Sequence, residues 1–279
     1  MFRLKLIIIF CFFAHMAMAQ TLHLKKRKNN AIGGHEFAQK ISDSTLSLKK
    51  REKIIFREIK RGNVPDFLRT LKNFITVSNH DPVKLSYYVL PDYLAIGSNE
   101  DFFYVPMTPM LAQKVAKLTH CVLPTKHLVD LIYQAARIKL NPQPIAPTAA
   151  MTTVPVFIAH TDSVIKQLKP FLAEHNESAL TAGHKKDIII SNKIYGENTA
   201  RVVIYGWHKS DGKAIQPVYN KHTNTWADYS HGVRLIQNTI YVDNKKTTLK
   251  KALKDPLLSR FFSDEGQITK PYYPVNAKY

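Results

Sequence analysis

Cysteine is almost absent from this chain, with only Cys11 and Cys121 among its 279 residues. Two cysteines are too few for the disulfide framework that stabilises many small exported domains, so a hydrophobic core must hold the fold together. Glycine is also scarce, at 10 residues, and no Gly-rich phosphate loop, dinucleotide-binding fingerprint or Gly-x-Ser-x-Gly element is present. Hydrophobic residues make up 45% and charged residues 22%, which excludes a collagen-like or wholly disordered chain.

Long hydrophobic runs are missing beyond the N-terminus. Residues 1–19 have the pattern of a secretory signal peptide, in which Arg3 and Lys5 precede an apolar run and alanines at 17 and 19 mark the cleavage site. The apolar run is too short to span the roughly 30 Å of a bilayer core. The sequence therefore predicts a secreted or periplasmic protein with no integral membrane segment after cleavage. Cys121 would then be the single cysteine, either a buried small hydrophobic residue or a nucleophile.

Acidic side chains are few, 21 against 40 lysines and arginines, which gives a net charge of +19. Residues 21–75 alone hold 14 basic and 5 acidic side chains. Such a surface attracts polyanions, and an anionic glycan or cell-wall polymer is the expected partner, although a solvated helix face would also explain the charge. Phe37 is the only aromatic residue between positions 24 and 53, so a base-stacking platform is missing and no nucleic acid is expected as a partner.

The chain divides into an arm and a domain. We expect residues 20–42 to form a flexible basic arm, because they contain the run Lys25-Lys26-Arg27-Lys28 and show little hydrophobic periodicity. Residues 43–279 are predicted to form one domain, with a possible sub-boundary in the proline-containing stretch 141–153.

Helix and strand signals occur in blocks. Helices are expected over residues 44–61, 63–74, 110–118, 126–137, 163–173 and 247–262, the last interrupted near Pro256. Strands are expected in a hairpin or meander over 84–106 and in a hairpin over 201–218. Single strands are expected over 154–159 and 187–191, and the strands 233–236 and 239–242 are expected to pair with each other. Blocks of this kind favour an α+β fold with a predominantly antiparallel sheet, on which the helical N-terminal portion packs.

Histidines gather in the second half of the chain, where six of the twelve fall between positions 160 and 231. Four segments there are dense in functional side chains: 159–162, 183–187 (GHKKD), 206–209 and 228–234, which begins with DYSHG. We expect folding to bring their imidazoles into a shared pocket.

Strand geometry adds detail to two of these segments. If residues 202–208 form a strand, Gly206 and His208 share a face, and Gly206 leaves room beside the imidazole for a ligand or another backbone. In an extended 228–234 segment, His231 and Ser230 would face opposite ways. Ser230 could not then use its neighbour as a base.

A metal site is one interpretation of the histidines. His184, Asp187 and His231 (or His208) would hold a divalent metal such as zinc, whose bound water attacks the substrate. A second interpretation is that the histidines are structural groups with local hydrogen-bond partners.

Metal-free acid–base chemistry is the third interpretation. His231 or His184 would be the base, Tyr229 or His208 the acid and Asp187 the orienting group, while Lys185 or Arg234 would bind an anionic group of the substrate. Trp207 and Tyr229 could line a sugar- or peptide-binding cleft, although core packing explains aromatic residues equally well.

Five stretches together resemble a group of exported bacterial proteins of unassigned activity: 51–71, 91–98 (PDYLAIGS), 123–125 (LPT), 183–187 (GHKKD) and 228–232 (DYSHG). The resemblance implies export and a single functional unit across residues 51–266. It implies no catalytic residue.

These observations predict an exported hydrolase acting on an extracellular or cell-wall polymer. Its catalytic residues are predicted to be His184, Asp187, His208 and His231. Its substrate-binding residues are predicted to be Lys185, Arg234, Tyr229 and Trp207. The alternatives are a polysaccharide lyase that uses His/Tyr acid–base chemistry, and a non-catalytic protein that binds anionic surface polymers through its Lys/Arg-rich helices.

Overall fold

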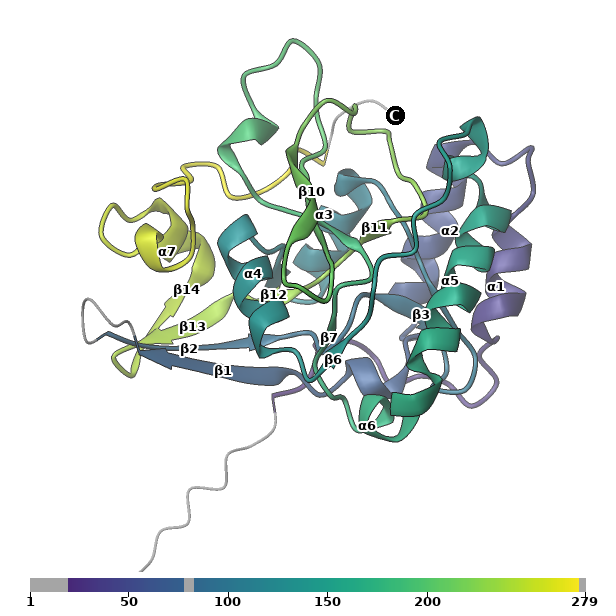
Figure 1. Cartoon of the computed structure of the whole chain (residues 1–279), viewed down its shortest axis with the longest axis horizontal. Helices are drawn as coiled ribbons and strands as arrows, with labels where there is room; N and C mark the ends of the chain where they lie inside the picture. Colours follow the sequence, from purple (N-terminus) through teal and green to yellow (C-terminus); the bar gives the residue numbers. More distant parts are fainter. Residues whose placement is uncertain (1–19, 78–82, 276–279) are drawn as a thin grey trace, which may run out of the picture.

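The computed structural model describes residues 20–77 and 83–275, so the predicted signal peptide lies outside the described residues. The largest sheet runs in the order β14 (Lys245–Thr248), β13 (Thr239–Val242), β2 (Lys84–Val89), β12 (Ile236–Gln237) and β5 (Cys121–Val122), with β1 (Lys72–Val77) also paired to β2. Every strand pair in it is antiparallel. In Figure 1 its long strands extend to one side of the molecule.

The second sheet contains four of the eight predicted site residues, Asp187, Trp207, His208 and His231. Its order is β10 (Ala214–Tyr219), β9 (Ile204–His208), β8 (Lys186–Ile188) and β11 (His231–Gly232), and only β8 and β11 run parallel. Two small sheets complete the strands: the antiparallel hairpin β3 (Ala95–Gly97) and β4 (Phe102–Tyr104), and the parallel pair β6 (Ile138–Lys139) and β7 (Thr181–Ala182). The predicted α+β fold with a mostly antiparallel sheet is confirmed.

The helices are α1 (Gly34–Ile41), α2 (Leu48–Lys60), α3 (Pro109–Leu118), α4 (Lys126–Ala135), α5 (Val154–Leu168), α6 (Leu172–Asn176) and α7 (Leu249–Lys254). Four of them begin after a hydroxyl residue whose side chain accepts a hydrogen bond from the backbone N–H three residues on: Ser47, Thr108, Thr125 and Thr248. None of the helices in the described part of the chain has both the length and the apolar character that a membrane crossing requires.

Residues 20–42 are packed into the fold, in contrast to the predicted flexible arm. Leu22 is buried, and α1 buries Phe37, Ala38 and Ile41. The spacing of these three residues in α1 is that of one helical face, which packs against α5 and the β3–β4 hairpin. The preceding basic run obscured this short apolar face in the sequence.

Three segments differ from the predicted secondary structure. Residues 63–74 form a 3-10 turn (Asp66–Leu68) and the start of β1 instead of a helix, because the apolar and β-branched residues that follow pair with β2. Residues 154–159 form the first turns of α5 instead of a strand, with Val154 and Phe157 buried one turn apart. β12 and β13 do not pair with each other. Both pair with β2, because the single residue between them cannot reverse the chain.

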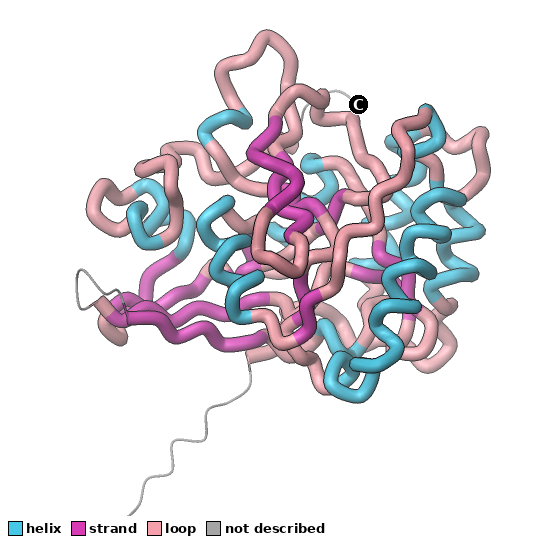
Figure 2. Tube along the Cα trace, in the orientation of Figure 1, coloured by secondary structure: helices cyan, strands magenta, loops and turns pink. Residues whose placement is uncertain are grey.

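Other elements agree with the sequence. The hairpin predicted over 201–218 is confirmed as β9 and β10, and the helices after Thr108 and Thr125 are confirmed as α3 and α4. Residues 141–153 are largely a loop between β6 and α5 (Figure 2). One hydrophobic core includes residues on both sides of this loop, such as Leu140 and Val154.

Candidate functional site

The GHKKD segment enters the interior at Gly183. This residue has φ +105°, and a Cβ there would clash with the Leu140 carbonyl oxygen, so the position requires glycine. The chain then continues into β8, and His184 and Lys185 just before this strand and Asp187 within it are each at most 2% exposed. These three predicted site residues therefore lie inside the fold.

Asp92 is a hub of this polar interior. Its carboxylate accepts hydrogen bonds from Tyr104 Oη at 2.6 Å, His175 Nε2 at 2.8 Å and the Tyr93 backbone N–H at 2.6 Å. Burial alone would raise the pKa of Asp92, but the neighbouring His184 and the hydrogen bond from His175 hold that pKa well below its usual range. Asp92 is therefore a buried anion with several donors around it.

Lys185 lies on the other side of the same segment. Its ammonium group donates to the Tyr229 carbonyl oxygen at 2.7 Å and lies 3.1 Å from His160 Nδ1. Burial lowers the pKa of Lys185 to about 7, although the Asp228 and Asp92 carboxylates act in the opposite direction. Lys185 is thus a buried amine that changes charge near neutral pH.

The end of the DYSHG segment lies directly beside β8. In the parallel β11–β8 pair, His231 is opposite Lys186 and Gly232 is opposite Asp187. A Cβ on Gly232 would lie 2.6 Å from the Tyr93 ring and 2.7 Å from Lys185 Cβ, so glycine allows this close packing. The GHKKD and DYSHG motifs are therefore one structural unit.

Residues 228–230 form a turn instead of an extended strand. Asp228 accepts hydrogen bonds from the Ser230 N–H and hydroxyl through Oδ1 and from Trp226 Nε1 through Oδ2. The Ser230 hydroxyl thus stabilises the turn. The predicted extended conformation is therefore wrong for these residues, and the Ser230 hydroxyl bonds to Asp228 and not to His231.

His184 and His231 are buried imidazoles in which both ring nitrogens lack a hydrogen-bond partner among the described residues, whereas His160 and His175 each have one such nitrogen. His184 Nε2 lies 3.4 Å from Asp92 Oδ1 and His231 Nε2 lies 3.7 Å from Asp228 Oδ2, but all four ring nitrogens lack a hydrogen-bond partner among the described residues. Burial lowers the pKa of both rings, that of His231 to about 4. The surroundings of both imidazoles therefore disfavour their protonated form.

The predicted metal ligands do not meet. The Tyr93 ring lies edge-on to His184, with ring centroids 4.9 Å apart, and its hydroxyl donates to Asp187 Oδ2 at 2.7 Å, so it separates the two. His231 turns instead toward Asp228. Within residues 20–77 and 83–275, no three His, Cys, Asp or Glu side chains are grouped so that they could hold a metal ion.

His208 is the predicted site residue that borders an open cavity. Its ring stacks on Tyr133 with centroids 4.4 Å apart, and its Nε2 lies 3.1 Å from Asp130 Oδ1. The cavity has a volume of about 560 Å³. It is lined by Asp130, Tyr133, Gln134, Lys139, Tyr205, His208, Ser210, Asp211 and Gly212.

Asp130, on α4, is the hydrogen-bond partner of His208 Nε2. It also accepts hydrogen bonds from Tyr205 Oη and Lys126 Nζ, both at 2.7 Å. Burial would raise the pKa of Asp130, but the hydrogen bonds from His208, Lys126 and Tyr205 lower it to about 2. Asp130 is therefore ionised at neutral pH and accepts a hydrogen bond from the Nε2–H of His208.

Asp187 approaches His208 from the interior. A Cβ on Gly206 would lie 3.5 Å from Asp187 Oδ2 and 3.6 Å from His208 Cε1, so the space that Gly206 leaves lies next to this carboxylate. Burial raises the pKa of Asp187 to about 6, against the lowering effect of Arg234, Tyr93 and His208. Two carboxylates with oppositely shifted pKa values thus lie near one imidazole.

The four residues predicted to bind substrate have structural partners in the interior. Arg234 donates to the carbonyl oxygens of Leu90 and Thr181 at 3.0 and 2.7 Å. Trp207 donates from Nε1 to the His184 carbonyl oxygen at 3.2 Å, and the Tyr229 hydroxyl accepts from the Ile145 N–H at 2.9 Å. With Lys185, these residues are at most 5% exposed, so they hold the site together rather than line its cavity.

Several residues of the site were not predicted. The sequence does not single out Asp130 and Tyr133, because both lie on α4. A polar residue among apolar ones in a helix is typical of an ordinary solvent-exposed face. Asp92 belongs to the PDYLAIGS stretch, but nothing in the sequence pointed to its three donors. Two of these donors, Tyr104 and His175, reach Asp92 through tertiary contacts across 12 and 83 residues of sequence.

No protein-family model matches the chain, and comparisons with curated proteins and with solved structures give no match either.

Proposed function

We propose that the protein is an exported hydrolase of an extracellular or cell-wall polymer, with His208 as its general base. One observation carries the proposal: the His208–Asp130 pair lines a polar cavity of about 560 Å³, and a second carboxylate, Asp187, lies inward of the same imidazole. Cavities of about 300–1,000 Å³ are typical of small-ligand sites. The His208 cavity has room for one sugar or peptide unit of a polymer.

The geometry supports a simple division of roles. The ionised Asp130 accepts a hydrogen bond from the N–H at His208 Nε2, which leaves Nδ1 as the basic nitrogen. His208 takes a proton from water while the water oxygen bonds to the scissile carbon. The bond to the leaving group then breaks, and the imidazolium gives its proton to the leaving oxygen or nitrogen. The overall reaction is the addition of one water across the bond.

Asp187 acts as a positioning residue in this scheme. Its carboxylate is held by the Tyr93 hydroxyl and lies behind Gly206, without lining the cavity. Above its pKa of about 6 its negative charge stabilises the imidazolium that forms on His208.

Export is part of the proposal. It is supported by the charged, apolar and small-residue pattern of residues 1–19 and by the resemblance to exported bacterial proteins.

The test is turnover by purified protein on a panel of peptidoglycan, anionic glycans and neutral glycans. We expect His208→Ala to reduce the rate by about 10²–10⁴-fold, because it removes the general base. His35→Ala is the matched control, since His35 is a surface histidine whose side chain is 46% exposed. The unfolding midpoint of each variant shows whether the fold is retained.

Two further measurements separate this mechanism from its rivals. A chelator should leave turnover unchanged, and chelator-sensitive turnover would contradict a metal-free base. A lyase would release an unsaturated sugar that absorbs ultraviolet light, whereas a hydrolase releases a saturated end. Full activity of a folded His208→Ala variant would refute the assignment.

A further inference from the structure

Two adjoining cavities form a groove where the N-terminal segment passes the end of α3. Their volumes are about 590 and 900 Å³, and they share His23, Leu118 and His120. The rings of His23 and His120 stack with centroids 4.2 Å apart and an interplanar angle of 14°. We call the two cavities together the basic groove.

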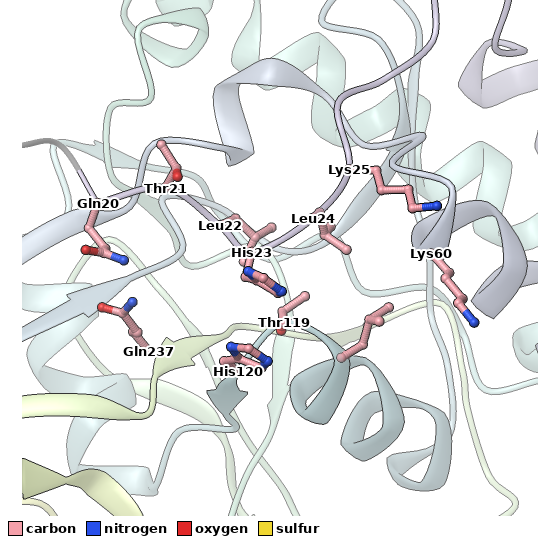
Figure 3. Close-up of a pocket in the computed structure, with 11 residues that line it drawn as sticks. Gln20, Thr21, Leu22, His23, Leu24, Lys25, Lys60, Thr119, His120 and Gln237 are labelled. Carbon is pink, nitrogen blue, oxygen red and sulfur yellow. The ribbon is translucent and has the colours of Figure 1, made fainter.

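Figure 3 shows the smaller cavity of the basic groove. His23 and His120 face each other in its middle, Gln20 and Gln237 lie to one side, and Lys25 and Lys60 lie toward the other. His120 follows the last turn of α3 with φ +57°, a left-handed conformation that few side chains adopt at the end of a helix. The rings thus divide a lysine side from an amide side.

The basic groove is lined by one sign of charge. Its lysines are Lys25, Lys60, Lys114, Lys117 and Lys250, and none of the described residues that line it is acidic. Within the part of the chain that the structure describes, no carboxylate forms an ion pair with Lys25, Lys60, Lys117 or Lys250. Burial, Lys117 and Lys254 lower the pKa of Lys250, which shows that these cations are crowded. An anionic ligand would relieve this repulsion.

The remaining lining residues indicate which anion fits. Phe56 and Tyr272 provide aromatic surface in the larger cavity, and Tyr272 is 42% exposed. Aromatic faces pack against sugar rings, and the side-chain amides of Gln20 and Gln237 can hydrogen-bond to hydroxyl groups. Among the described residues, none that lines the basic groove is an arginine, the residue best suited to phosphate and nucleic acid. These features favour carboxylate groups on a sugar chain over phosphodiesters.

We propose that the basic groove binds a carboxylated glycan chain across the His23–His120 pair, with the lysine ammonium groups on its carboxylates. This site is separate from the His208 cavity, with which it shares no lining residue. The proposal therefore does not depend on the hydrolase assignment.

The test is calorimetric binding of an oligogalacturonate to the full chain carrying His208→Ala, so that turnover does not interfere. We expect the double variant Lys117→Glu/Lys250→Glu to weaken binding by about tenfold or more, because it reverses two charges in the groove. The matched control is Lys166→Glu/Lys169→Glu, which reverses two exposed charges at the end of α5 and should change affinity by about twofold or less. Lys117→Gln/Lys250→Gln serves if the reversed variant does not fold.

Three outcomes would overturn the proposal. The first is an equal loss of affinity in the control, which would show that net charge rather than the groove binds the glycan. The second is tighter binding of polyphosphate or single-stranded DNA at the same lysines. The third is the absence of oligogalacturonate binding. Retained binding together with a fully active His208→Ala variant would refute the hydrolase assignment alone.

Discussion

At the scale of single residues, Lys185 is the group whose pKa follows most directly from its surroundings. It is 1% exposed, and its ammonium group is bonded to the Tyr229 carbonyl oxygen and His160 Nδ1. A buried amine loses the hydration that stabilises its charge, which is why its pKa falls from 10.5 to about 7. The unfolded chain would therefore protonate this amine far more readily than the folded protein does.

We predict that Lys185 makes the fold more stable as pH rises above neutral. Its folded pKa is depressed, so its contribution is present above 10.5 and is lost as pH falls through about 7. The wild-type free energy of unfolding should therefore increase by roughly 2 kcal/mol between pH 7 and 9, and Lys185→Met should lack this increase. Chemical denaturation at both pH values measures it, with exposed Lys166→Met as control. Parallel pH profiles for wild type and Lys185→Met would contradict the assignment.

At the scale of elements, a buried carboxylate joins α2 to the start of α3. Glu52 is 2% exposed and accepts hydrogen bonds from the Thr108 N–H at 2.7 Å and the Thr108 hydroxyl at 2.9 Å. The Thr108 hydroxyl in turn accepts from the Leu111 N–H and caps α3. Glu52 thus fixes the start of α3, whose other end leads to His120 in the basic groove.

Glu52→Ala should destabilise the protein by about 2–4 kcal/mol, because it leaves two buried donors of Thr108 without their acceptor. Glu52→Gln should cost less, since its amide oxygen can still accept one of these bonds. The measurement is the free energy of unfolding, and Glu36→Ala, at an exposed position in the first turn of α1, is the control. If Glu52→Ala were as mild as the control, the Glu52–Thr108 contact would not stabilise the packing of α2 on α3.

Elements with strong local signals could be predicted from the sequence. The Thr108 and Thr125 caps and the Ser-Asp-Gly turn at 210–212 define α3, α4 and the β9–β10 hairpin through residues close in sequence. Residues 154–159 were misassigned because a short apolar run has no period of its own. Only the tertiary packing of α5 decides that Val154 and Phe157 share one helical face.

The candidate site could be predicted only in part, because sequence patterns indicate local geometry, whereas the site depends on contacts between residues far apart in the sequence. Period-two geometry predicted room beside His208 at Gly206, but a Cβ there would already be in van der Waals contact with Asp187, Val129 and His208. The same rule failed at residues 228–230, where Asp228 forms a turn with the Ser230 backbone and hydroxyl. Asp130 could not be paired with His208 from sequence, because they lie 78 residues apart.

At the scale of the whole molecule, the interior is unusually rich in neutral histidine. His160, His184 and His231 are buried, and burial lowers the pKa of all three. An unfolded chain would protonate each of them near pH 6.5, while the folded chain resists until lower pH. Asp187 acts in the opposite direction, because its folded pKa of about 6 exceeds the ordinary value of 3.8. Three groups therefore favour unfolding in mild acid, and one opposes it.

The fold should consequently lose stability steeply between pH 6.5 and 5. The contribution of a base with a depressed folded pKa is present above pH 6.5 and is lost as pH falls toward the folded value, which for His231 is about 4. Three such bases give a slope of up to roughly 4 kcal/mol per pH unit, from which Asp187 subtracts at most about 1.4. Urea denaturation at pH 7, 6 and 5, followed by tryptophan fluorescence, measures this slope.

Asp130 and Asp92, whose pKa values are depressed, stay ionised down to pH 5 in both the folded and the unfolded state and do not contribute to this slope. A midpoint that stayed constant from pH 7 to 5 would mean that these imidazoles take up protons in the folded protein, and the dense packing around Asp92 and Lys185 would then have to admit water.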